Sequence, residues 1–199
     1  MIPLPLSYYE TQDVVGLARD LIGKLLVTQF EGKLTIGRII ETEAYQAPED
    51  QASHAFQNKR TVRNAPMYES GGIAYVYLCY GIHHLFNIVT GPEGIPHAIL
   101  IRGILPVEGE IEMLLRRGKS NPSKSLGIGP GSMSQAMGIT TLQNKVPLLD
   151  TNLFLSDDGK HYSESEIRSA PRVGIPYAGD WMHKPWRFLG PEHPEKIKK

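Results

Sequence analysis

Apolar residues recur along the chain with two periods, which predict a small set of helices and strands. After Thr11, a suitable N-cap, apolar side chains at helical spacing predict a first helix over 12–22. Runs rich in β-branched and aromatic residues predict strands, and the turn 31–33 should join the first two into a hairpin. The predicted strands are 24–30, 34–45, 73–79, 84–90, 98–105, 153–155 and 186–189.

Two further helices are expected in the middle of the chain. One covers 106–117, with a proline at its first position and a glycine directly after it. Ser132 follows a glycine-rich turn and can cap a short helix that extends to Met137. The segment 46–71 lacks a clear period, so we expect a long loop with short helical turns, which in compact domains often carries function.

The content of turn residues favours a sheet protein over a helical bundle. The chain has 199 residues, of which 20 are glycine, 15 are proline and 41% are apolar. This composition supports a hydrophobic core connected by many turns. We predict a single α+β domain over residues 1–199, with a mainly antiparallel sheet and packed helices. The polar stretch 190–199 should be a frayed tail.

The sequence shows no signal for export or membrane insertion. No apolar run approaches the roughly 18 residues of a membrane helix, and residues 1–6 do not have the pattern of a signal peptide. Cys79 is the single cysteine, so no intramolecular disulfide can form, and its apolar run favours a buried small side chain over a nucleophile. We expect a cytoplasmic protein without a membrane partner, associated with the nucleoid if its source is bacterial.

Charge is balanced overall but clustered locally. The chain has 21 basic and 21 acidic residues, and a zero net charge weakens the case for a nucleic-acid-binding protein. Basic side chains nevertheless gather in three places, where they can bind phosphates or form plain solvated surface. These clusters are Lys59, Arg60 and Arg63; Arg116, Arg117, Lys119 and Lys124; and Lys184 and Arg187.

One predicted strand has a candidate catalytic face. Alternate residues of a strand share a face, so Glu41, Glu43 and Tyr45 should point the same way. A carboxylate beside an aromatic ring suits a site that binds a flat ring and activates water next to it. The same pattern also fits a half-exposed strand whose polar face meets solvent, and spacing alone does not separate the two interpretations.

The tip of the second predicted hairpin is another candidate feature. Tyr80 and Gly81 interrupt the strands, which puts an aromatic ring where the chain reverses. A protruding aromatic ring suggests insertion into another molecule, such as a base stack. Tyr75 and Tyr77 share a strand face nearby, and this arrangement also fits ordinary core packing.

The sequence contains no recognisable metal or nucleotide motif. The seven histidines lack the paired spacing of a zinc site, and there is neither a Walker loop nor a dinucleotide glycine fingerprint. We therefore expect no metal and no cofactor. The glycine-rich segment 127–131 can present amides to a phosphate at a helix start, or can serve only as a turn.

A series of short motifs spans the chain in order, from about residue 8 to 189. They are Arg38-Ile39-Ile40-Glu41-Thr42-Glu43-Ala44-Tyr45, Pro48-Glu49-Asp50, Ala52-Ser53-His54, Thr61 with Arg63-Asn64, Tyr75-Val76-Tyr77 with Tyr80-Gly81, Asn87-Ile88, Leu100-Ile101-Arg102, Pro106-Val107-Glu108-Gly109, Gly129-Pro130-Gly131, Pro171-Arg172-Val173-Gly174 and Lys184-Pro185-Trp186-Arg187-Phe188. Together they resemble the alkyladenine (3-methyladenine, or N-methylpurine) DNA glycosylases of the mammalian type. An ordered set over nearly the whole chain is highly specific.

The resemblance implies a role for each matched position. Glu43 corresponds to the catalytic general base, Arg102 to a residue that helps hold the attacking water, and Tyr80 to a wedge that fills the gap in the duplex. The side chains that would stack on the flipped base are Tyr45, His54 and Tyr77. Asn87 would discriminate against the exocyclic amine of guanine, and the main chain at Ala52 and Val173 would touch base or water. The candidate phosphate contacts are Lys59, Arg63 and Gly131.

The resemblance also implies a fold and an activity. The fold would be similar to the C-terminal domain of methionyl-tRNA formyltransferase, with a curved, barrel-like sheet. The activity would be that of a monofunctional, monomeric DNA glycosylase of base excision repair. It would flip alkylated or deaminated purines out of duplex DNA and hydrolyse their N-glycosidic bond with a glutamate-activated water, which leaves an abasic site.

Two other functions fit some of the same features. One is a nucleoside or sugar glycosidase that uses Glu41 and Glu43 as paired carboxylates. The other is a non-catalytic nucleic-acid-binding module on the same fold. A glycosidase would leave the tyrosine at the hairpin tip and the basic clusters without a role, and a binding module would bind nucleic acid without releasing a base.

Overall fold

A computed structural model describes residues 1–123 and 125–195. Lys124, which belongs to the second basic cluster, and residues 196–199 of the predicted tail lie outside the described residues. In the described part, eight strands form one antiparallel sheet with the neighbour order β3–β4–β5–β2–β1–β6, and β8 pairs with β2 and β7. The strands are β1 (Leu25–Phe30), β2 (Lys33–Gln46), β3 (Ala74–Cys79), β4 (His83–Thr90), β5 (His97–Glu108), β6 (Leu153–Ser156), β7 (Arg168–Ala170) and β8 (Arg187–Leu189).

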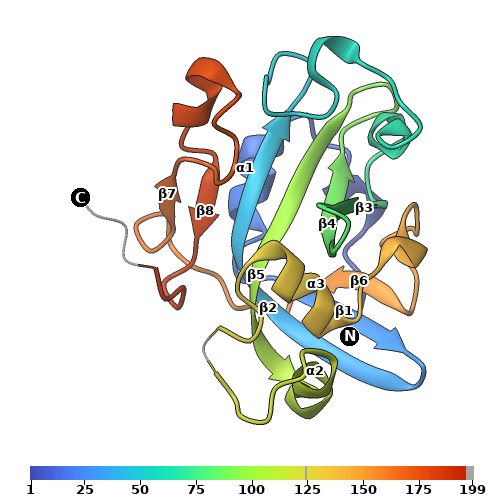
Figure 1. Ribbon diagram of the computed structural model, residues 1–199, viewed down its shortest axis with the longest axis vertical. Helices are drawn as coiled ribbons and strands as arrows, with labels where there is room; N and C mark the ends of the chain where they lie inside the picture. Colours follow the sequence, from blue (N-terminus) through green and yellow to red (C-terminus); the bar gives the residue numbers. More distant parts are fainter. Residues whose placement is uncertain (124, 196–199) are drawn as a thin grey trace.

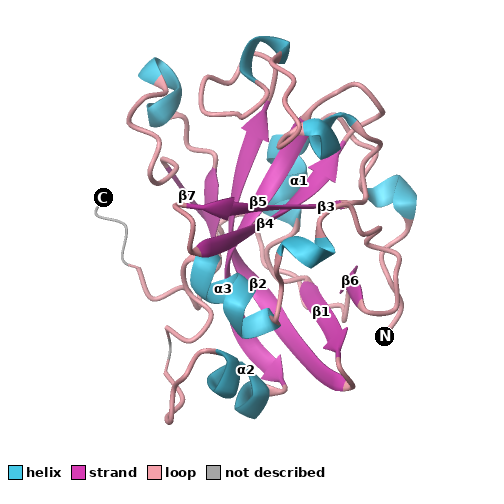
Figure 2. Ribbon diagram, turned by 45° about the vertical axis from the view of Figure 1, so that its right-hand side comes forward, coloured by secondary structure: helices cyan, strands magenta, loops and turns pink. Residues whose placement is uncertain are grey.

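The long strands β2 and β5 run side by side through the centre of the molecule (Figure 1). β2 pairs with β1 through its first half and with β8 through residues 41–43. The β2–β5 register shifts on both sides of Glu41, and such bulges bend and twist a strand. In Figure 2 the β3–β4 hairpin lies across the direction of β2 and β5, so the sheet is strongly curved. The predicted α+β fold with a curved antiparallel sheet is confirmed.

Helices pack on the sheet around one main hydrophobic core. α1 (Val14–Asp20) packs against β2, and α3 (Pro130–Met137) packs against β4 and β5. The described part of the chain has no helix of the length and apolar character needed to cross a membrane. The helices are α1 (Val14–Asp20), α2 (Glu110–Arg116) and α3 (Pro130–Met137), with 3₁₀ turns η1 (Leu6–Tyr8), η2 (Phe56–Asn58), η3 (Ala65–Tyr68), η4 (Thr141–Gln143) and η5 (Gly179–His183).

The helix starts differ from the predicted ones for local reasons. Asp13, not Thr11, caps α1, since its carboxylate accepts a hydrogen bond from the Gly16 amide at 2.8 Å. Helix α3 starts two residues before Ser132, with Pro130 at its first position. The predicted short helical turns in the loop 46–71 are confirmed by η2 and η3.

The predicted helix over 106–117 is wrong in its first turn. Pro106 and Glu108 still belong to β5, where they pair with Gly37 and Ile36 of β2. The chain changes direction only at Gly109, which has a φ of 76° and precedes α2. Sheet pairing across the molecule therefore outweighs the local preference of Pro106 for a helix start. The short strand β7 was not predicted, because its three residues show no clear period.

The described end of the chain is packed against the sheet. His193 is buried, and the carboxylate of Glu195 accepts a hydrogen bond from the guanidinium of Arg187 on β8. The prediction of a frayed tail is therefore wrong for residues 190–195.

Candidate active site

The carboxylates of β2 point into the molecule rather than into solvent. The hydroxyl of Tyr45 donates a hydrogen bond to Oε2 of Glu43 at 2.8 Å, which shows that the two side chains share a face. Arg102, from the neighbouring β5, lies against Glu41 and Glu43. Both carboxylates are buried, so the interpretation of a solvated polar face is wrong.

Glu43 is completely buried, with 0% of its surface exposed. Its Oε1 accepts a hydrogen bond from the main-chain N–H of Val173 at 2.7 Å, and Nε of Arg102 lies 3.4 Å from the same oxygen. Burial raises the pKa of Glu43 above its usual value, although Arg102, Val173 and Tyr45 act in the opposite direction. A carboxylate with a raised pKa accepts a proton more readily and suits a general base.

Glu41 lies two residues before Glu43, and its surroundings shift its pKa in the opposite direction. Its Oε1 accepts hydrogen bonds from Nε of Arg187 at 2.6 Å and from Nε of Arg102 at 2.9 Å. Nε2 of His193 lies 3.3 Å from Oε2. Burial works to raise the pKa of Glu41, but His193 and the two arginines outweigh it and bring the value to about 2. Glu41 is therefore a permanently ionised anchor for Arg102, while Glu43 is the carboxylate that can take up a proton.

The sheet leaves room for the side chain of Glu41. Gly103 of β5 is paired with Glu41, and a Cβ at this glycine would lie 3.1 Å from Cβ of Glu41 and 3.4 Å from its Oε2. A larger residue would push the carboxylate out of its position between the arginines. The glycine thus helps to place both Glu41 and Arg102.

A second buried ion pair, between Asp50 and Arg172, joins the loop after β2 to the connection between β7 and β8. The guanidinium of Arg172 donates hydrogen bonds to the carboxylate of Asp50 and, at 2.8 Å, to the carbonyl oxygen of Ala44. Asp50 also accepts a hydrogen bond from the amide of Ala52 at 3.0 Å. Both ionic side chains are fully buried. This clamp links the main chain at Ala52 to Arg172, the neighbour of Val173, whose N–H donates to Glu43.

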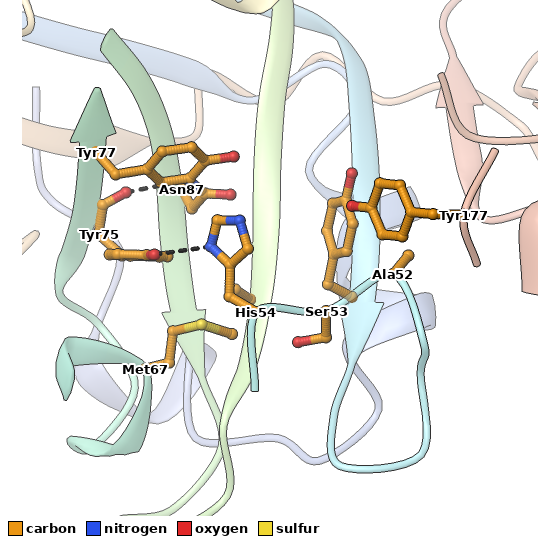
Figure 3. A pocket seen from close by; sticks show the side chains of 10 residues that line it. Ala52, Ser53, His54, Met67, Tyr75, Tyr77, Asn87 and Tyr177 are labelled. Carbon is orange, nitrogen blue, oxygen red and sulfur yellow. Dashed lines mark hydrogen bonds between the residues drawn. The ribbon is translucent and has the colours of Figure 1, made fainter. Parts of the chain in front are cut away.

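An aromatic pocket lies next to the strand face (Figure 3). Its inner cavity has a volume of about 50 Å³ and opens into a cleft of about 470 Å³. The predicted pocket residues Tyr45, Ala52, His54, Tyr77 and Asn87 all line the cavity. The cavity is further lined by Ser53, Met67, Tyr75, Ala98 and Tyr177.

The polar side chains of the pocket are held in place by hydrogen bonds. Nδ1 of His54 shares a hydrogen bond of 2.9 Å with the hydroxyl of Tyr75 (Figure 3). Burial, together with the charge of Arg63, lowers the pKa of His54 to about 4, so the imidazole is neutral at pH 7. Nδ2 of Asn87 donates to the carbonyl oxygen of Tyr75 at 3.1 Å. The role of Asn87 against guanine stays a prediction.

The larger cleft contains most of the other predicted site residues. Arg102, Val173, Tyr80, Arg63 and Gly131 line it. Glu43 itself lies behind the cleft wall, since Tyr45, Arg102 and Val173 line the cleft and Glu43 has no exposed surface. In this structure, a molecule in the cleft reaches Glu43 only after one of these three neighbours moves aside.

Tyr80 protrudes at the tip of the β3–β4 hairpin, as predicted. Its surface is 91% exposed, and its φ of 51° lies in the left-handed region, which costs a tyrosine about 1–3 kcal/mol. Gly81 also has a positive φ, of 73°, so the two residues form the kind of turn that tightly connects antiparallel strands. Cys79 before them is half-exposed and lines the cleft, so the prediction of a buried side chain is wrong.

The basic clusters only partly form free surface. Arg187 is buried against Glu41, and Arg116 forms an ion pair with Glu112 at 3.2 Å, so neither is a simple surface charge. Arg63 stacks on the ring of Tyr77, 4.5 Å from its centroid, at the edge of the cleft. Lys59 lies on a neighbouring depression that Arg63 also lines, and not in the cleft itself. Among the described residues, no three His, Cys, Asp or Glu side chains gather as a metal site requires.

The buried networks contain residues whose role was not predicted. Asp50 and Arg172 stand in the recognised motifs, which are the only signal for them in the sequence, and Arg187 was singled out only as a member of a basic cluster. His193 and Glu195 stand outside the motifs, and their contacts with β8 and Glu41 arise only when the chain folds back.

Comparison with known proteins agrees with this site. The family described as "Methylpurine-DNA glycosylase (MPG)" matches residues 8–194. A relative from Chlamydia abortus, assigned as a 3-methyladenine DNA glycosylase, is 49% identical over 187 residues, which cover 94% of this chain and 97% of the relative. Relatives with the same assignment occur in Natranaerobius thermophilus, 43% identical over 92% of this chain and 93% of the relative, and in Bacillus cereus, 38% identical over 98% of both chains.

Proposed function

The chain belongs to the methylpurine-DNA glycosylase family, and we propose that it excises alkylated or deaminated purines from duplex DNA by hydrolysing their N-glycosidic bond. The observation that carries the proposal is a pair of buried carboxylates whose pKa values are shifted in opposite directions, beside a pocket of neutral aromatic rings. A flat base fits between such rings, and one carboxylate is free to act as a base. As a hydrolase of N-glycosyl bonds, the protein would act in DNA repair.

The aromatic pocket supports recognition of the base outside the helix. Flipping a base out of a duplex costs a few kcal/mol. Stacking on aromatic side chains contributes about 1–3 kcal/mol per base, so Tyr45, His54 and Tyr77 can offset this cost. Alkylation at a purine ring nitrogen makes the base cationic, and electron-rich rings attract a cation by a further ~0.5–2 kcal/mol. The neutral His54 adds no repulsion to such a base.

The proposed chemistry uses Glu43 as the general base. When Arg102 or Val173 moves aside, a water molecule from the cleft reaches Glu43, and its oxygen forms a bond to C1′ of the deoxyribose. Glu43 takes the proton of this water, and its negative charge stabilises the cation that develops on the sugar. The bond from C1′ to the purine breaks, and a cationic alkylpurine leaves as a neutral molecule without help from a strong acid.

The product is expected to be an intact strand with an abasic site. A strand-cleaving glycosylase needs an amine that forms an imine with the sugar. In the described part of the chain, no lysine lines the inner pocket or the larger cleft.

Two rival functions make different predictions in one experiment. The protein is incubated with dimethyl sulfate-treated duplex DNA and, separately, with free methylated nucleosides, and released bases are identified by chromatography. We expect methylpurines from the duplex and far slower release from nucleosides. Preferential cleavage of nucleosides would favour a nucleoside or sugar glycosidase, and binding to DNA without any release would favour a non-catalytic binding module.

A further inference from the structure

Tyr177 lines the base pocket, although no motif drew attention to it. The residue lies on the connection between β7 and β8 and contributes to both the inner cavity and the larger cleft. Figure 3 shows it beside Ala52, on the side of the pocket opposite Tyr75, Tyr77 and Asn87. Its ring is therefore at the mouth of the pocket, where a base would pass on its way in.

Tyr177 has an exposed ring on a stretch of main chain whose neighbouring side chains are buried. Ile175 and Ala178 on either side are buried and pack with Ala52 in one small apolar cluster. The side chain of Tyr177, by contrast, is 66% exposed. An exposed aromatic ring on an anchored backbone can change its rotamer at little cost.

We propose that Tyr177 is the outer wall of the base pocket and closes over a flipped purine opposite Tyr77. This inference rests on the proposed function, because it requires a base in the pocket. The ring would cover the solvent side of the base and retain it while Glu43 acts. A tyrosine hydroxyl is neutral at pH 7, and burial raises the pKa of Tyr177 above its ordinary 10.0, so the ring adds no charge beside a cationic base.

A wall and a wedge predict different effects of residue loss on duplex and single-stranded substrates. A wedge fills the gap in the duplex, so its loss matters only where the target base starts out stacked and paired. The wall contacts the base after flipping, so its loss should affect duplex and single-stranded substrates by the same factor. The stacking contribution of one aromatic side chain corresponds to a roughly five- to hundredfold change.

Three variants test the wall in single-turnover release of 3-methyladenine from methylated duplex and methylated single strands. Tyr177→Ala should slow release by roughly five- to hundredfold on both substrates. It should weaken inhibition by free 3-methyladenine to a similar extent. Tyr177→Phe keeps the ring and should remain within about twofold of the wild type. Leu142→Ala, a change at another exposed apolar side chain outside the pocket and cleft, is the matched control and should have no effect.

Several outcomes would overturn the inference. If Tyr177→Ala releases base as fast as the active wild type, Tyr177 is not part of the pocket. A loss confined to duplex DNA would assign the ring to the DNA helix instead of the flipped base. If the wild type itself releases no base, the proposed function fails, and this outcome is distinct from an active wild type with an unaffected Tyr177→Ala variant.

Discussion

At the scale of single residues, the site depends on how differently the fold treats two glutamates on one strand. Both are buried, but in the described part of the chain Glu43 has one cationic neighbour, with Nε of Arg102 3.4 Å from its Oε1, whereas Glu41 contacts Arg102, Arg187 and His193. The strand period predicted that they share a face. It could not predict which one keeps its charge, because the deciding partners come from β5, β8 and the chain end.

The raised pKa of Glu43 predicts the acid side of the activity profile. A general base must be ionised, so base release should fall as the pH drops through the pKa of Glu43, which lies above the ordinary value of 4.5. The measurement is single-turnover release as a function of pH on methylated duplex DNA. An acid limb at or below 4.5 would contradict the burial argument.

Glu41 should govern stability in acid. Its pKa falls from an ordinary 4.5 to about 2 on folding, so its ionised form stabilises the protein above 4.5, and this contribution is lost as the pH falls toward 2. Glu41→Gln removes the carboxylate that Arg102 and Arg187 share, and breaking such a buried ion pair should cost about 3–5 kcal/mol at neutral pH. Urea unfolding across this pH range should show a smaller loss in acid for the variant than for the wild type. Parallel curves would refute the role of Glu41 as an ionised anchor.

At the scale of elements, local patterns predicted most strands, and long-range contacts determined what the patterns left open. The alternation in β2 and the β-branched run in β3 were sufficient for their prediction. The first turn of the predicted helix after Pro106 was wrong, because pairing with β2 extends β5. The clamp between Asp50 and Arg172 joins residues 122 positions apart, and no local pattern connects them.

The clamp should be essential for both stability and the site. Asp50→Ala leaves the guanidinium of Arg172 buried without a counter-ion, which should cost about 3–5 kcal/mol. Glu69→Ala is the matched control, because it breaks an exposed ion pair with Lys145 and should cost at most about 1 kcal/mol. Chemical denaturation measures both free energies of unfolding. Equal effects of the two changes would mean that Asp50 and Arg172 do not hold the loops.

At the scale of the whole molecule, the curved sheet brings distant segments to one cleft. β2 and β5 supply the carboxylates and Arg102, the β3–β4 hairpin supplies Tyr80, and the loop before β8 supplies Val173. Tyr80 is both exposed and held in a left-handed conformation, two unfavourable features that a structural role does not explain. The sequence predicted that Tyr80 lies at the hairpin tip. Its left-handed backbone conformation and its place in the cleft became visible only in the folded structure.

Tyr80→Ala should separate the wedge from the pocket. Because the ring is needed only when the target base is stacked, the change should slow excision from duplex DNA much more than from single strands. Tyr80→Phe keeps the ring and should behave like the wild type. Thermal melts should change little for either variant, since the side chain is 91% exposed. Equal losses on both substrates would make Tyr80 a pocket residue, and a large drop in Tm would make it part of the core.

The most direct test of the proposed mechanism is single-turnover base release by Glu43→Gln on methylated duplex DNA, with DNA binding measured in parallel. The glutamine amide can still accept the hydrogen bond from Val173 but cannot take up a proton. We predict release at least ~10²-fold slower than in the wild type, with DNA binding largely kept, as expected for loss of a general base. Near-normal release by the variant would remove Glu43 from the chemistry and contradict the proposed mechanism.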